Sequence, residues 1–318
     1  MRPPYRFALA FPLLIALLTG CSTRGTPSSP SAATGASADQ ADVASTLASD
    51  PSYVDDEVSE SPDQTSLQSP ATTARARVAN PATAVRPLTF WRQIRNVERT
   101  FEFAFADTDS TGRPTRCVVT VHKHITGSFN LLVSDDVPEG SPPSAHVIHK
   151  PLVDNAVRRV LLRRVRLDGP DFERSAWRVV ATSGVRITSR DAQSHIASLR
   201  IQSGALDTTI TEPLAFFRLR QIVQLDPTAY VTLTATTLRN DDVTLLYLAD
   251  RRVPFHNNGD NTYSITFRVP DADGLHHVGV NALSNGTLYD DVAPYDSQSW
   301  IEPFIVHPLL IAADTPTE

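Results

Sequence analysis

The sequence predicts an all-β fold in which two antiparallel β-sandwich domains follow a signal peptide and a long disordered linker. Apolar and β-branched runs of four to eight residues recur between turn-forming residues from Phe101 to Leu283, as is typical of short strands. Among them are Ile196–Ile201, Val231–Thr237, Val243–Leu248 and His276–Leu283. Phe101, Phe103 and Phe105 alternate with other residues, which places their rings on one face of a strand. Because helical patterns do not separate the runs, antiparallel sandwiches are favoured over a parallel α/β fold.

Residues 1–20 have the composition of a signal peptide. Arg2 and Arg6 precede the apolar run Phe7–Leu18, which is shorter than the ~20 residues that a membrane-spanning helix needs. The run leads into the sequence Leu-Thr-Gly-Cys at positions 18–21. Retention at a membrane therefore requires something other than a span.

The Leu-Thr-Gly-Cys sequence resembles the lipobox of bacterial lipoproteins. The resemblance implies cleavage before Cys21 and attachment of lipid to the Cys21 sulfur, and two or more acyl chains would hold the protein stably at a membrane. Because Ser22 and not aspartate follows the cysteine, the resemblance also implies the outer membrane. The alternative is an ordinary secretory signal with a cysteine nearby by chance.

Residues 21–86 are predicted to form a lipid-anchored, disordered linker. Serine, threonine, alanine and proline dominate this segment, and such a composition buries too little apolar surface to offset the entropy of ordering. Acidic residues gather at Asp50, Asp55, Asp56, Glu57, Glu60 and Asp63. We expect a featureless spacer, with a recognition motif as the alternative.

Residues 87–220 are predicted to form a β-rich domain of unknown family. Trp91–Thr100 is the one part with helical spacing, and we expect a short helix there. Asp107–Gly112 begins like a calcium loop, but Val118 stands where that loop requires glutamate, so a hairpin is favoured. Val157–Arg166 fits a helix or a strand, and the β-rich run that follows favours a strand.

Residues 221–308 are predicted to form a second sandwich, followed by a disordered tail over 309–318. Asn257–Ser264 is a turn rich in Gly, Asn and Asp that leads into a strand, and Pro270–Gly274 precedes the next strand. These two turns resemble those of the immunoglobulin-like modules of bacterial surface and periplasmic proteins. The resemblance covers about 90 residues and implies an immunoglobulin-like β-sandwich.

Composition limits the partners and the covalent chemistry. The formal net charge of −6 over 318 residues gives no basis for a nucleic-acid partner. With Cys21 lipidated, Cys117 is the only remaining cysteine, so no disulfide can form within the chain. Cys117 lies in an apolar run, which predicts a buried and unreactive thiol.

Catalytic signatures are absent, and we expect neither catalytic residues nor a cofactor. The chain lacks the sequence patterns of serine hydrolases, zinc proteases, phosphate-binding loops and dithiol redox proteins. His122 and His124 alternate along a strand and could share a metal; the nearest third ligands in sequence are His146 and His149. A polar strand edge explains the pair equally well.

The tract 281–296 is a second place to look for a ligand. Asp290 and Asp291 could hold a calcium ion or face a partner, and the alternative is a packed loop in which Tyr289 and Tyr295 lie against the sheet. His276 and His277 are neighbours in a strand, so they should point to opposite faces.

The sequence therefore predicts a membrane-anchored envelope lipoprotein. We expect its β-sandwich domains to serve a non-catalytic binding, assembly or structural role, with the membrane and an envelope protein or glycan as partners. The alternative is a metal-assisted extracytoplasmic hydrolase that uses His122 and His124.

Overall fold

The computed structural model describes residues 31–56, 58–60, 65–66, 83–134, 144–167, 174–248 and 251–307. The predicted signal peptide, Cys21 and the tail lie outside these ranges. The described part is all-β with two α-helices, α1 (Ser31–Ser49) and α2 (Asn285–Tyr289), as the sequence predicts. Two short 3₁₀ turns cover Pro51–Tyr53 and Leu219–Gln221.

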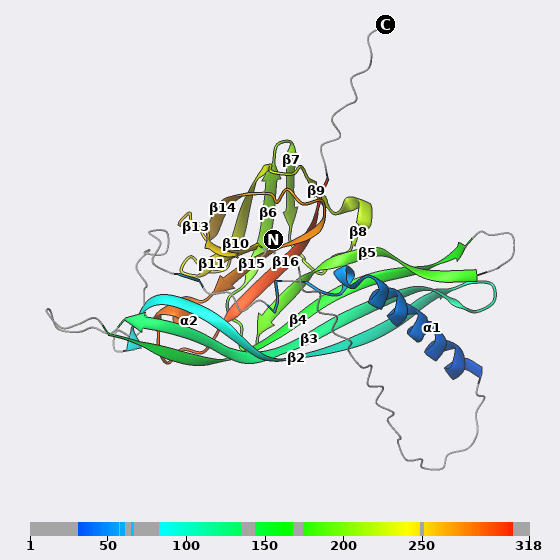
Figure 1. Ribbon diagram of the computed structural model, residues 1–318, viewed down its shortest axis with the longest axis horizontal. Helices are drawn as coiled ribbons and strands as arrows, with labels where there is room; N and C mark the ends of the chain where they lie inside the picture. Colours follow the sequence, from blue (N-terminus) through cyan, green and yellow to red (C-terminus); the bar gives the residue numbers. More distant parts are fainter. Residues whose placement is uncertain are drawn as a thin grey trace, which may run out of the picture.

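An eleven-stranded sheet forms the body of the molecule (Figure 1). Along its main path the strands are β1 (Thr65–Ser66), β2 (Arg86–Thr108), β3 (Pro114–Ser134), β4 (Ala145–Leu167), β5 (Arg174–Ser189), β16 (Ser297–Val306), β15 (Gly274–Leu283), β11 (Val243–Leu248) and β12 (Arg251–Pro254). β8 (Phe217–Arg218) pairs with β5, and β9 (Val223–Leu225) pairs with β16 in the one parallel ladder of the described residues. We call this the large sheet.

A second, five-stranded sheet packs on part of the large sheet. In spatial order its strands are β13 (His256–Asn257), β14 (Thr262–Arg268), β10 (Tyr230–Thr237), β6 (Ile196–Ser203) and β7 (Leu206–Ile210). Its ladders are antiparallel. We call it the small sheet. The predicted boundary at residue 220 does not separate two sets of strands, because β6 pairs with β10 from beyond it, and β5 pairs with β16.

Both predicted turns of the C-terminal half are present. Residues 258–261 join β13 to β14, and Gly259 and Asn261 adopt the positive φ angles of 90° and 65° that such a hairpin requires. The turn at 270–274 carries the chain from β14 in the small sheet to β15 in the large sheet.

The predicted helix over Trp91–Thr100 is wrong, because these residues lie inside β2 and pair with β3. A bulge between Ile94 and Asn96 shifts the register by one residue. Ile94 and Val97 therefore reach the same side of the strand, where both pack on one apolar cluster. This imitates the three-residue spacing of a helix. Gly127 lies opposite the bulge, where a Cβ atom would come within 2.1 Å of the Gln93 carbonyl oxygen.

Three other predictions for the first half are confirmed. Val157–Arg166 belongs to β4 and pairs with β5, and residues 109–113 form the hairpin between β2 and β3. Within this hairpin the Asp109 carboxylate accepts hydrogen bonds from the backbone N–H groups of Thr111 and Arg113. Phe103 and Phe105 pack against one cluster, as expected for rings on one face.

The prediction of a disordered linker through residue 86 is wrong for residues 31–56 and 58–60. They form α1 and a segment of residues 50–56 and 58–60 that we call the strap, and both pack against the large sheet (Figure 1). Val43, Leu47 and Val54 are buried against β3, β4 and β5. Of the rest of the predicted linker, residues 65–66 form β1 and residues 83–86 lead into β2, while 21–30, 57, 61–64 and 67–82 lie outside the described residues.

The strap and the small sheet cover opposite faces of β15. Val278, Val280 and Ala282 belong to the apolar core shared with the small sheet. Gly279 faces the other way, since a Cβ atom on it would lie 3.0 Å from the Cγ1 atom of Val58 in the strap. The large sheet is therefore the middle layer at this strand.

Candidate functional site

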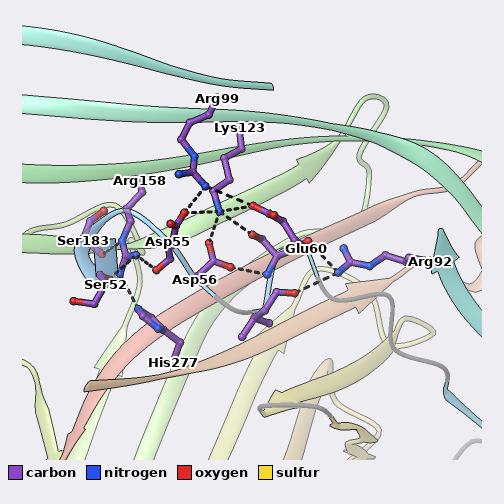
Figure 2. Close-up of polar contacts among 12 residues, drawn as sticks. Ser52, Asp55, Asp56, Glu60, Arg92, Arg99, Lys123, Arg158, Ser183 and His277 are labelled. Carbon is purple, nitrogen blue, oxygen red and sulfur yellow. Dashed lines mark hydrogen bonds and ion pairs between the residues drawn. The ribbon is translucent and has the colours of Figure 1, made fainter. Parts of the chain in front are cut away.

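The strap places acidic side chains over basic side chains of the large sheet (Figure 2). Asp55, Asp56 and Glu60 come from the strap, and the basic partners project from three neighbouring strands: Arg92 and Arg99 from β2, Lys123 from β3 and Arg158 from β4. We call this set the strap cluster. The contacts of Lys123 alone join residues that are 63 to 67 positions apart in the sequence.

Lys123 lies at the centre of the strap cluster. Its Nζ atom is 2.9 Å from Glu60 Oε1, 3.4 Å from Asp56 Oδ2 and 3.3 Å from Ser59 Oγ. The Lys123 side chain is only 4% exposed and that of Asp56 only 1%. Both charges are therefore removed from water and depend on each other.

The environment of Asp56 favours its charged form. Burial alone would raise the pKa of this carboxyl group, but Lys123, hydrogen bonds from Ser59 and Arg158 together lower it below its usual value of 3.8. The Ser59 backbone N–H donates to Asp56 Oδ1. Asp56 is thus a buried carboxylate held by one cation and a turn of its own segment.

Arg158 extends the cluster toward β15. Its Nη1 atom donates to the carbonyl oxygens of Asp55 at 3.1 Å and Ser52 at 3.4 Å, and its Nη2 atom lies 2.9 Å from His277 Nε2. Burial, and then the positive charge of Arg158, lower the pKa of His277 to about 3. The imidazole is therefore neutral at physiological pH and accepts this hydrogen bond.

Arg92 ties the other end of the strap to the sheet. Its Nη2 atom donates to the carbonyl oxygens of Ser59 at 3.1 Å and Val58 at 3.3 Å, and its Nη1 atom lies 3.8 Å from Asp154 Oδ2. Burial raises the pKa of Asp154 to about 6, although Arg92 and a hydrogen bond from Tyr295 act in the opposite direction. The basic side chains thus hold strap carbonyl groups as well as carboxylates.

The arrangement is suited to holding a segment in place on the sheet. The charged groups of the strap cluster contact one another or backbone carbonyls. Lys123, Asp56, Arg92 and Arg158 are buried, whereas Asp55, Glu60 and Arg99 remain partly exposed at its edge. Among the described residues, no group of three or more His, Cys, Asp or Glu side chains is placed to hold a metal ion.

His122 and His124 do not meet a third ligand in the described residues. They lie on the face of β3 opposite Lys123, where His122 Nε2 is 3.7 Å from Glu102 Oε2 and His124 Nδ1 is 2.9 Å from Asn155 Oδ1. His149 pairs with Asn130, six residues from His124 along β3, which is roughly 20 Å away. His146 lies farther still, opposite Val133.

Cys117 and the neighbouring histidines His276 and His277 lie as the sequence predicts. Cys117 is fully buried under α1, and burial raises the pKa of its thiol to about 11. His276 stacks on Phe304 while His277 points to Arg158 on the other face. The lipid-attachment residue Cys21 lies outside the described residues.

The loop between β15 and β16 is packed, as one of the two alternatives for this tract proposes. The Tyr295 ring is buried and stacks on Phe129 with the ring centroids 5.2 Å apart. Tyr289 packs on the same cluster. Lys150 Nζ donates to the carbonyl oxygens of Asp290 at 2.6 Å and Gly286 at 3.1 Å, and so fixes the loop to β4.

The strap cluster was not predicted from the sequence, where its acids were assigned to a spacer. One signal could have revealed it. Lys123 shares the strand face of Val119, Val121 and Ile125, which are buried, and a lysine on an apolar face requires an acidic partner.

Comparisons with known proteins leave the function open. The chain matches no family model, no curated protein and no solved structure. In the described part of the chain, neither helix has the length and hydropathy to cross a membrane.

Proposed function

We propose that this chain is an envelope lipoprotein anchored through Cys21, whose β-sheet body has a non-catalytic binding, assembly or structural role. The sequence up to Cys21 supports the anchor. What carries the proposal is the integration of residues 31–56 and 58–60 into the fold, since α1 packs on the large sheet and the strap after it is bound there through buried charges.

This packing shortens the tether. Nine residues, 22–30, separate Cys21 from α1, and even fully extended they span only about 30 Å. A folded body attached at this distance stays next to the membrane surface. A flexible spacer needs none of the strap contacts. A protein that works close to its membrane needs a tether that starts at a fixed point on the folded body.

The anchor is tested by comparing the wild-type chain with the Cys21→Ser variant in a bacterial host. We expect the wild type to stay in the outer-membrane fraction after a high-salt wash and its mature N-terminal peptide to carry the mass of a diacylglyceryl group. The Cys21→Ser variant should be released. Cys117→Ala serves as the matched cysteine control and should stay in the membrane.

The outcome that would overturn the proposal is an unmodified Cys21 thiol in protein that remains freely soluble. A Ser22→Asp variant tests the choice of membrane, because the lipoprotein resemblance implies that aspartate at this position moves the protein to the inner membrane.

A further inference from the structure

A polar pocket lies where three loops meet at one end of the two sheets. The loops join β5 to β6, β10 to β11, and β15 to β16. Together they enclose a hollow of about 280 Å³. The strap cluster is not part of its lining.

The charge of the pocket is predominantly negative. Asp191, Asp241, Asp290 and Asp296 line it, against one cation, Arg239. Arg239 is already matched, since its Nε and Nη2 atoms lie 3.1 and 3.3 Å from the two carboxylate oxygens of Asp241. Arg239 also interacts with Asp296, and Lys150 from β4 with Asp290, but the four carboxylates of the lining still outnumber its single cation.

Two of these carboxylates are fixed in position by the backbone. Asp296 Oδ1 accepts hydrogen bonds from the N–H groups of Gln193 at 2.9 Å and Ser194 at 3.1 Å. Asp290 Oδ1 accepts from Val292 at 3.0 Å and Ala293 at 3.3 Å. Rigid acceptors of this kind bind a ligand at low entropic cost.

A largely buried amide in the lining has no hydrogen-bond partner among the described residues. Asn285 is 7% exposed, and its side chain makes no hydrogen bond to any described residue. Burying an amide without a hydrogen bond is unfavourable. The oxygen of Asn285 is therefore available to accept a hydrogen bond from a bound group.

The neighbouring Asp242 responds to the same negative field. Its side chain is buried and its Oδ2 atom has no hydrogen-bond partner. Burial first, and then the charges of Asp241 and Asp296, raise the pKa of Asp242 to about 7, against the opposing effects of Arg239 and Ser194. A cation in the pocket would relieve this repulsion.

The spacing of the acceptors favours an extended cation over a metal ion. No three carboxylates in the described residues are close enough together to hold a metal. A guanidinium group presents five N–H donors in a planar fork and can reach separated oxygens at once. Two exposed aliphatic residues neighbour the lining in sequence, Leu238 before Arg239 and Val292 before Ala293, with exposures of 63% and 72%.

We propose that this pocket binds an arginine side chain of a partner polypeptide, whose flanking apolar residues contact Leu238 and Val292. This inference specifies the chemistry of a partner for the proposed binding role. It rests on the proposed function only for the cellular location in which that partner is encountered. The site requires no reaction and no further cofactor.

The test measures the binding of a fluorescein-labelled peptide, Gly-Ser-Leu-Arg-Leu-Ser-Gly, to the full chain in non-ionic detergent by fluorescence anisotropy. Matched peptides carry lysine or the uncharged isostere citrulline in place of arginine. We expect the arginine peptide to bind at least about tenfold more tightly than the citrulline peptide and also more tightly than the lysine peptide.

Two double variants with equal charge change locate the site. Asp191→Asn with Asp290→Asn removes two pocket carboxylates and should weaken arginine-peptide binding about tenfold. Asp271→Asn with Asp273→Asn removes two exposed carboxylates at the opposite end of β15 and should leave binding within about twofold. An Asn285→Ala variant should weaken binding without changing the net charge.

Several results would overturn the proposal. These are no binding of the arginine peptide at millimolar concentration, equal binding of the arginine and citrulline peptides, equal effects of the two double variants, or tighter binding of spermidine than of the peptide, which would indicate a polyamine site. The Cys21→Ser variant should bind the peptide normally, so failure of the anchor and failure of this pocket are distinguishable.

Discussion

The two covers of the large sheet are held by different forces. The small sheet covers β11, β15 and β16 through an apolar core that includes Leu233, Tyr263, Trp300 and Phe304. The N-terminal segment covers β3, β4 and β5 with a smaller apolar cluster under α1 and with the charges of the strap cluster. One cover is a shared core, whereas the other is a separate segment attached to a finished sheet.

The difference teaches where the molecule can open. The small sheet and the large sheet share one apolar core. The small sheet therefore cannot separate from the large sheet without exposing that core to water. The strap and α1 add no strand to the large sheet over residues 31–60, so their removal would leave its ladders intact. Segments with few buried apolar contacts open at lower free energy than the core. We therefore expect the N-terminal cover to detach at a lower free energy than the small sheet.

The largest expected effect follows from removing the central cation. Lys123→Met leaves the buried Asp56 carboxylate without its partner, and such changes cost about 3–5 kcal/mol. The double variant Lys123→Met with Asp56→Asn should be more stable than Lys123→Met alone, because the uncompensated charge is gone. Urea denaturation of the full chain measures both. If the single and double variants are equally unstable, the packing of Lys123 and not its charge holds the strap.

The sequence predicted the class of fold better than the extent of its strands. Alternating patterns located β6, β10, β11 and β15 closely, because one face of each strand is buried and the other is not. The bulge in β2 hid the continuity of a 23-residue strand. Whether the strands on either side of residue 220 pair is a long-range property that no local pattern carries.

The strap cluster was hidden for a related reason. Its acids stand in a segment rich in Ser, Thr, Ala and Pro, and its cations stand in strands far along the chain. A single sequence shows the charges but not which of them meet. The pocket at the loop ends was closer to prediction, since Asp290 had been assigned to a loop that could face a partner, but Asp191 and Asp241 join it only through the fold.

A matched pair of leucine truncations compares the two covers directly. Leu233→Ala lies in the apolar core and Leu47→Ala lies under α1, and both leucines are buried. We expect Leu233→Ala to lower the free energy of unfolding by about 2–5 kcal/mol and Leu47→Ala by an amount near the lower limit of this range. Leu47 packs in the smaller cluster under α1, where the truncated site can close up more readily than in the apolar core.

Cys117 supplies the second readout of this pair, because it is buried in the same cluster as Leu47. In a Cys21→Ser background it is the only thiol. Leu47→Ala should raise its rate of reaction with 4,4′-dithiodipyridine under native conditions by about tenfold, while Leu233→Ala should raise it only in proportion to global unfolding. Equal labelling rates in the two variants would show that both covers open together.

Acid should loosen the strap before the apolar core. The pKa of Asp56 is below its usual value of 3.8 in the folded chain, so its charge contributes full stability above pH 3.8 and this contribution is lost as the pH falls through the lower folded-state value. The reporter for the apolar core is Ala235→Cys in a Cys21→Ser, Cys117→Ala background, since Ala235 is fully buried in that core. Labelling rates are normalised at each pH to the rate of the unfolded chain. As the pH falls, labelling of Cys117 should therefore rise at a higher pH than labelling of the Ala235→Cys reporter. Asp56→Asn should flatten the acid rise at Cys117 and leave the Ala235→Cys reporter unchanged. If both thiols become reactive at the same pH in every variant, the charged cover and the apolar cover form one cooperative unit, and the contrast between them is one of composition and not of stability.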